Sequence, residues 1–187
     1  MAKKVITKEM ILKAAFELLR KEGATALSVR SIAHSCDCST QPIYLSFKGI
    51  DEIKDEICKI AMEYFYEYLL KMVAEKKYPE YKAMGMAYVK FAHDEPELFK
   101  YVFMTKPRIK YDSVDASFET SVSVIKRNLN ISNEAARKLH LEMWIFGHGI
   151  ATMYITNYID FDLDTVSEMY KDVYTGIIKN LGGSNDN

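Results

Sequence analysis

The segment that decides the fold reads Ser39-Thr40-Gln41-Pro42-Ile43-Tyr44-Leu45-Ser46-Phe47. Proline fits an α-helix only in its first turn, where the backbone N–H that it lacks would have no intrahelical partner, so Pro42 predicts a short helix that Ser39 or Thr40 caps. Ile43 and Phe47 are four residues apart and share the face that we expect to be buried. The polar side chains fall on the outer face: Thr40, Gln41, Tyr44 and Ser46.

A second short helix is predicted just before this segment. Ser28 can cap it, and Asp37 lies where the chain must turn, since aspartate adopts a left-handed backbone more readily than most residues. Its inner face is apolar: Val29, Ile32, Ala33 and Cys36. Residues 28–47 therefore predict a helix, a tight turn and a second helix, the arrangement that places the second helix in the major groove of DNA. The alternative is a solvated capping turn between two ordinary helices.

The charged side chains are distributed unevenly, with a basic N-terminal segment followed by an acidic remainder. Residues 1–48 carry eight basic and four acidic side chains, a net charge of +4, whereas the remainder carries 17 basic and 22 acidic, a net charge of −5. This asymmetry suggests that only the N-terminal part meets a polyanion.

Apolar residues make up 49% of the 187 residues, with 8 Gly and 4 Pro, which favours an all-α protein with a sizeable core. We expect no membrane-spanning segment and no secretory signal, hence a cytoplasmic protein.

Helical periodicity continues along the chain and predicts about nine helices. Thr7 can cap a first helix that ends at Gly23, and six helices follow residue 50. Their predicted ranges are 51–75, 80–93, 96–104, 114–128, 132–157 and 163–181. Ser132 can cap the helix at 132–157, and Asp162 or Asp164 the helix at 163–181. We expect a helix-turn-helix domain over residues 1–50, with the motif at 28–47, and a second helical domain over residues 51–187. The basic loop at 106–110 reads as solvated, and the tail at 182–187 as frayed.

Two segments resemble the TetR family of bacterial transcription regulators. Gly23-Ala-Thr-Ala-Leu-Ser28-Val-Arg30-Ser-Ile32-Ala33 and Cys38-Ser39-Thr-Gln-Pro-Ile43-Tyr44-Leu-Ser-Phe47 match the family in spacing and residue type. The resemblance implies an all-helical homodimer in which a small DNA-binding domain precedes a larger domain that dimerises and binds an effector. The sequence departs from the family pattern where Asp37 replaces a glycine, Ser46 a histidine and Ile50 a lysine.

We predict the residues that contact double-stranded operator DNA from this pattern. They lie on the exposed sides of the two short helices and at the end of the motif: Ser28, Arg30, Ser39, Thr40, Gln41, Tyr44, Ser46 and Lys48. Lys48 is expected to supply the phosphate contact that Ile50 does not, since Asp51 and Glu52 follow Ile50 and would repel phosphate.

The stretch Met143-Trp144-Ile-Phe-Gly147-His148-Gly149 predicts a ligand-binding segment. Two glycines inside a helix cost about 1 kcal/mol each relative to alanine, so they permit either close helix packing or room for a ligand. Trp144 and His148 share one face, and the Trp-x-x-x-His-Gly pattern resembles the effector domain of one TetR subfamily. We therefore predict a mostly apolar pocket with polar anchors, lined by Tyr68, Tyr88, Phe103, Trp144 and His148. The alternative for His148 is a core histidine with its hydrogen bonds satisfied.

The predicted function is a transcription repressor that a small apolar or aromatic effector releases from its operator. The apolar stripe of the last helix predicts a subunit interface, so we expect a homodimer through residues 132–157 and 163–181. Two alternatives stay open: a helical ligand-binding or adaptor protein without operator function, and an activator of the same fold. No catalytic motif, metal-ligand spacing or cofactor site is recognisable, so we expect no enzyme. His93-Asp94-Glu95 is the only dense polar cluster, and we expect it to cap a helix.

Overall fold

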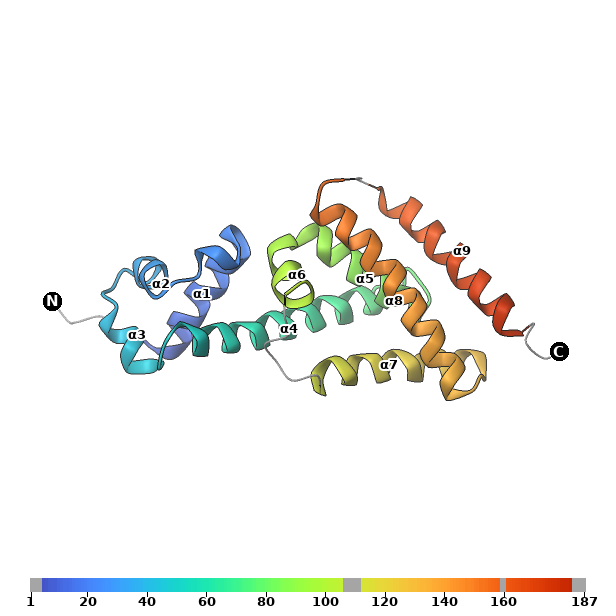
Figure 1. Ribbon diagram of the computed structural model, residues 1–187, viewed down its shortest axis with the longest axis horizontal. Coiled ribbons are helices and arrows are strands. Elements are labelled where there is room, and N and C mark those ends of the chain that lie inside the picture. The colour runs from blue at the N-terminus through green and yellow to red at the C-terminus, as the bar shows by residue number, and fades with distance from the viewer. Residues whose placement is uncertain (1–4, 106–111, 159–160, 183–187) are drawn as a thin grey trace. The chain divides into compact units, whose positions relative to one another are not determined.

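The computed structural model describes residues 5–105, 112–158 and 161–182 (Figure 1). Within these ranges the chain forms nine α-helices, one 3-10 helix and no strand, which confirms the all-α prediction. The chain divides into two compact units, Met1–Tyr66 with Glu95–Lys110 and Glu67–Asp94 with Tyr111–Asn187. The functional boundary at residue 50 stays a prediction. No helix in the described ranges is long and apolar enough to span a membrane.

The first unit begins with α1 (Lys8–Glu22), whose ends form as predicted. The Thr7 side chain accepts a hydrogen bond from the Met10 N–H at 3.3 Å, which satisfies one of the free donors at the helix start. Gly23 ends the helix with φ 81°, a conformation that favours glycine. The buried side of α1 consists of Ile11, Ala15, Leu18 and Leu19. These side chains form the surface on which the two short helices pack.

The helix-turn-helix consists of α2 (Val29–Ser35) and α3 (Gln41–Ser46), preceded by the 3-10 helix η1 (Ala24–Ala26). Ser28 caps α2 reciprocally with Ser31: each backbone N–H donates to the other side chain, at 3.0 and 3.1 Å. Asp37 adopts φ 52° in the turn between the helices, as predicted. Thr40 occupies the N-cap position of α3, but its side chain makes no capping hydrogen bond, so the predicted cap is correct in position and wrong in mechanism.

Two further helices complete this unit: the first part of α4 (Ile50–Ala74), and α6 (Pro96–Phe103). The Tyr101 hydroxyl of α6 donates to the Lys54 carbonyl at 2.9 Å, and the rings of Phe65 and Phe103 meet edge to face at 5.0 Å. The expectation that the His93-Asp94-Glu95 cluster caps a helix is wrong for Glu95. Its side chain makes no cap hydrogen bond to α6 and instead binds Arg20 of α1.

The second unit contains α5 (Glu80–Asp94), α7 (Asp112–Leu129), α8 (Asn133–Ile155) and α9 (Leu163–Gly182). Helix α8 packs against the other three. Ser132 caps α8 by accepting from the Ala135 N–H at 3.1 Å, and Asp162 caps α9 by accepting from the Thr165 N–H at 2.8 Å, as predicted. The core of this unit joins apolar side chains of all four helices, among them Val89, Ile125, Leu139 and Val166. The loop at 106–110 and residues 183–187 of the predicted tail lie outside the described residues.

Candidate functional site

Helix α3 has two different faces, as predicted. Ile43 is fully buried and Phe47 nearly so, while Gln41 and Tyr44 are exposed. Thr40 and Ser46 are half-buried, and Ser39 and Lys48 are exposed at the two ends of the helix. The Lys8 ammonium lies 4.7 Å from the centre of the Phe47 ring and adds a positive charge at this end of the unit. The structure therefore gathers six of the predicted DNA-binding residues on and beside one short helix, and their contacts with DNA stay predictions.

The two predicted residues of α2, Ser28 and Arg30, are both exposed. The Ser28 hydroxyl accepts from the Ser31 N–H and also lies 2.8 Å from the Ser31 hydroxyl, so capping already occupies two of the hydrogen bonds that it can form. A hydroxyl fixed in this way can still accept or donate one further bond. Arg30 follows two residues later and extends a long cationic side chain from the first turn of α2.

The start of α4 has its own acidic group. The Lys48 backbone N–H donates to Glu52 Oε2 at 2.7 Å, so a carboxylate already lies at the end of the helix where a phosphate would be attracted. Ile50 is half-buried at the first position of α4. The Lys48 side chain remains exposed. This geometry supports the prediction that any phosphate contact here comes from the Lys48 ammonium.

Leu45 is a surface residue of α3 that the sequence analysis did not single out. Its side chain is 81% exposed, beside Tyr44 at 60%. Its place two residues after Ile43 and two before Phe47 is the signal in the sequence that predicts exposure. Residues two apart lie on roughly opposite sides of an α-helix, so residue 45 points outward when residues 43 and 47 point inward. An apolar group therefore lies within a row of polar side chains.

In the second unit, three of the five predicted ligand-binding residues meet. The Tyr88 hydroxyl and His148 Nδ1 are 2.8 Å apart, and the rings of Trp144 and His148 stack with centroids 5.5 Å apart. Burial raises the pKa of Tyr88 and lowers the pKa of His148, so both are neutral at pH 7. Trp144 is 43% exposed, so one side of this cluster faces the surface of the unit.

The other two predicted residues have different surroundings. Tyr68 packs edge to face on Phe91 at 5.4 Å, and its hydroxyl donates to Asp94 at 2.7 Å. Phe103 belongs to the first unit, where it packs on Phe65 and on Phe99 at 5.0 Å. Phe103 therefore belongs to a different unit from Tyr88, Trp144 and His148.

The two glycines of α8 differ in what surrounds them. A Cβ at Gly147 would lie 2.1 Å from the Tyr170 hydroxyl oxygen, whereas a Cβ at Gly149 would meet nothing within 4 Å. Gly85 of α5 also makes room for Tyr170, since a Cβ there would lie 2.5 Å from the Tyr170 ring. Of the two possibilities left open by the sequence, Gly147 therefore serves close helix packing.

A second tyrosine–histidine pair escaped the sequence analysis. The Tyr81 hydroxyl lies 2.9 Å from His140 Nδ1, and the Phe118 ring packs edge to face on His140 with centroids 4.5 Å apart. Burial lowers the pKa of His140 to about 4. Tyr81 and His140 are 59 residues apart, and neither belongs to a recognisable motif, so no pattern in the sequence points to their pairing.

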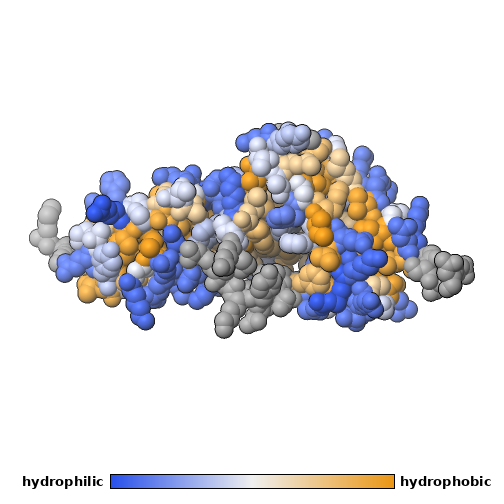
Figure 2. Space-filling view, in the orientation of Figure 1, coloured by the Kyte–Doolittle hydropathy of each residue, from blue (hydrophilic) through white to orange (hydrophobic). Residues whose placement is uncertain are grey.

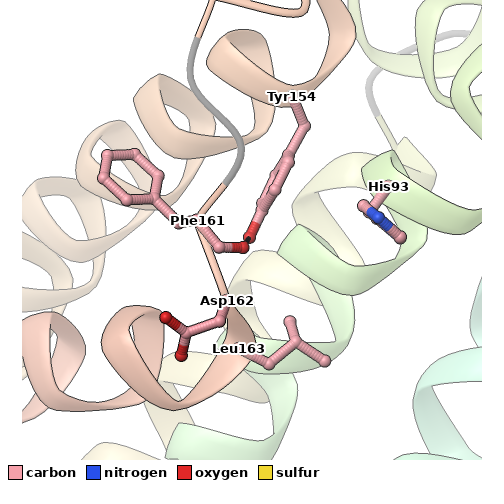
Figure 3. Close-up of a pocket in the computed structure, with 5 residues that line it drawn as sticks. All are labelled: His93, Tyr154, Phe161, Asp162 and Leu163. Carbon is pink, nitrogen blue, oxygen red and sulfur yellow. Dashed lines mark hydrogen bonds between the residues drawn. The ribbon is translucent and has the colours of Figure 1, made fainter.

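A pocket of about 390 Å³ lies elsewhere in the same unit, between the ends of α5, α8 and α9 (Figure 3). Its lining residues are His93, Tyr154, Phe161, Asp162 and Leu163. The Tyr154 hydroxyl donates to the Phe161 carbonyl, and the rings of His93 and Tyr154 meet edge to face at 5.3 Å. None of the predicted ligand-binding residues lines this pocket.

Both halves of the chain match known protein families. The family described as "Bacterial regulatory proteins, tetR family" matches residues 11–57, and "Tetracyclin repressor-like, C-terminal domain" matches residues 81–174. The chain belongs to the TetR family. No curated protein matches the chain at a significant level. Family membership identifies a DNA-binding transcription regulator, as the helix-turn-helix predicted.

Solved structures share the TetR fold of this chain at low sequence identity. A protein of unknown function from Rhodococcus sp. RHA1 has a TM-score of 0.75 and 20% identity, covering 90% of this chain and 93% of its own. A TetR-like transcriptional regulator from the same organism has a TM-score of 0.68 and 14% identity, with coverages of 98% and 100%. A proposed fatty acid metabolism regulator from Clostridium perfringens has a TM-score of 0.59 and 17% identity, with coverages of 89% and 97%.

Proposed function

We propose that this TetR-family regulator is a homodimeric repressor whose α3 helices read an operator and whose second unit binds a small apolar or aromatic effector. The observation that carries the DNA-binding part is α3 itself. Two buried anchors, Ile43 and Phe47, fix the helix on its unit and leave Gln41 and Tyr44 exposed. A helix held in this way presents hydrogen-bonding groups to base edges at a low cost in conformational entropy.

The dimer is supported by an exposed apolar row on α8. Leu141 is 46% exposed, Trp144 43% and Ile145 57%, and they lie within one turn of each other. Figure 2 shows hydrophobic surface over α8 and α9, bordered by hydrophilic residues. A contiguous exposed apolar surface of this kind is typical of a protein–protein interface. We propose that α8 and α9 meet their counterparts in a second copy, as the apolar stripe of the last helix predicted.

The effector class is supported by the composition of the second unit. Its core combines aliphatic side chains with the buried Tyr154 and Tyr170. Tyr88, Trp144 and His148 form an aromatic cluster with polar groups at its centre, because the Tyr88 hydroxyl meets the His148 ring nitrogen. A cavity opened beside them would suit an apolar or aromatic molecule that offers one or two hydrogen-bonding groups. Binding that favours a second arrangement of this unit would lower operator affinity by a population shift.

Selection of binding sites from a random DNA pool with the full-length protein tests this function. We expect one enriched sequence with two related half-sites, because a dimer presents two α3 helices. Fluorescence anisotropy should then show binding to that duplex at least 1,000-fold tighter than to a scrambled one. Binding that depends on salt but not on sequence would contradict the proposal.

A further inference from the structure

The most exposed large hydrophobic side chain in the described ranges belongs to α3. Leu45 is 81% exposed, and it lies one helical turn after Gln41 on the same side of the helix. Tyr44 beside it is 60% exposed. Gln41, Tyr44 and Leu45 therefore form one outer face, which we call the reading face, opposite the buried Ile43.

The chemistry of the major groove restricts what can meet a leucine on this face. The base edges there present hydrogen-bond donors and acceptors, and the one apolar group among them is the C5 methyl of thymine. Placed against any other base edge or a phosphate, the leucine would displace water from polar groups without replacing their hydrogen bonds, which is unfavourable. A thymine methyl is the partner that a leucine complements.

We propose that Leu45 contacts a thymine methyl and specifies thymine within each half-site of the operator. This inference rests on the proposed DNA-binding function and adds a specificity-determining residue to it. Gln41 forms two hydrogen bonds best with adenine. Four residues along an α-helix span about 6 Å and neighbouring base pairs are about 3.4 Å apart, so the thymine lies within about two base pairs of the base that Gln41 reads.

Single exposed apolar residues are common on protein surfaces, so the test must isolate the methyl group. The enriched duplex is synthesised with each thymine of the half-site replaced, one at a time, by deoxyuridine, which removes only that methyl. At one position the replacement should weaken binding of the unmodified protein about fourfold per half-site, the effect of exposing one buried methyl group. Leu45→Ala should bind the thymine and deoxyuridine duplexes equally.

The control is Gln41→Ala, which should bind more weakly but keep the thymine preference at that position. Leu45 is exposed, so Leu45→Ala should melt at the temperature of the unmodified protein. Should that variant fail to fold, the deoxyuridine series on the unmodified protein still overturns the inference if no thymine position shows a methyl effect. No methyl effect within two base pairs of the Gln41 position, or the same effect in Leu45→Ala, would overturn the inference. If one site is enriched but shows no methyl effect, the inference about Leu45 is wrong and the proposed function remains intact. If no site is enriched, both the proposed function and the inference are contradicted.

Discussion

Arg20 of α1 binds Glu95, the residue before α6, through two nitrogens: Nε donates to Oε2 at 2.7 Å, and Nη2 donates to Oε1. The Tyr64 hydroxyl of α4 donates to the same carboxylate at 3.1 Å. The Glu95 side chain is 8% exposed and the Arg20 side chain 38%. One carboxylate thus ties together three helices of the unit that contains the helix-turn-helix, and the first of these helices supports α2 and α3.

Removing the arginine should be costly because it leaves a buried carboxylate with one donor. We expect Arg20→Ala to lower the free energy of unfolding by about 1–3 kcal/mol, a range reduced for the partial exposure of Arg20. The double variant Arg20→Ala/Glu95→Ala should lose less than the sum of the two single variants. Lys21→Ala, at an exposed position in the same turn, is the control and should change stability by less than about 0.5 kcal/mol. Urea unfolding measures all four, and strict additivity would show that the pair contributes nothing.

Gly147 and Gly149 provide a matched pair on α8. Gly147→Ala places a methyl group against the buried Tyr170, so we expect a loss of about 1–3 kcal/mol in unfolding free energy. Gly149→Ala meets open space and should gain up to about 1 kcal/mol from helix propensity. Thermal and urea unfolding measure the stability of both glycine variants. Adding Tyr170→Phe to Gly147→Ala should recover much of the lost unfolding free energy, because it removes the hydroxyl oxygen that clashes with the new methyl group. Equal stability of the two glycine variants would contradict the close packing at Gly147.

His140 makes the stability depend on pH. It is neutral in the folded protein with a pKa of about 4, whereas an unfolded histidine has a pKa near 6.5. The unfolded state therefore binds more protons between these values, so stability should fall as the pH decreases from about 6.5 to 4, by roughly 3 kcal/mol from this group. Urea unfolding across this range should show a flatter dependence for His140→Gln, which keeps a hydrogen-bonding group but does not titrate. An unchanged pH dependence in that variant would show that His140 is not the source.

The apolar row on α8 predicts a dimer that a single charge disrupts. A carboxylate at Ile145 would be buried without a partner in the proposed interface, so Ile145→Asp should give a monomer in sedimentation velocity at micromolar concentration. Ile177→Asp, on α9, should have the same effect. Leu70→Asp is the control, because Leu70 of α4 is 64% exposed outside the α8 row, and this variant should stay dimeric. A monomeric unmodified protein would contradict the interface.

Local signals made most of the fold predictable. Thr7, Ser28, Ser132 and Asp162 cap the helices that the sequence analysis assigned to them, and Asp37 takes the left-handed turn, because each of these features depends on residues within one turn. The buried anchors of α3 followed from spacing alone.

The side-chain pairs that join distant helices were not predictable in this way. Arg20 and Glu95 are 75 residues apart, and Tyr170 contacts the carbonyl of Gly85 across 85 residues. Such pairs depend on how helices cross, and one sequence without its relatives does not reveal that geometry. Phe103 was grouped with Trp144 for the same reason, although it packs in the first unit.

The most direct test of the central claim, that α3 reads operator bases, is the affinity of Gln41→Ala for the selected duplex and for a scrambled duplex of equal length. Gln41 is exposed, so the variant should fold normally. We predict a loss of about 1–3 kcal/mol on the selected duplex, roughly 5- to 150-fold in Kd, and little change on the scrambled one, because base contacts carry specificity and phosphate contacts do not. An equal loss on both duplexes, or no loss on either, would contradict the claim.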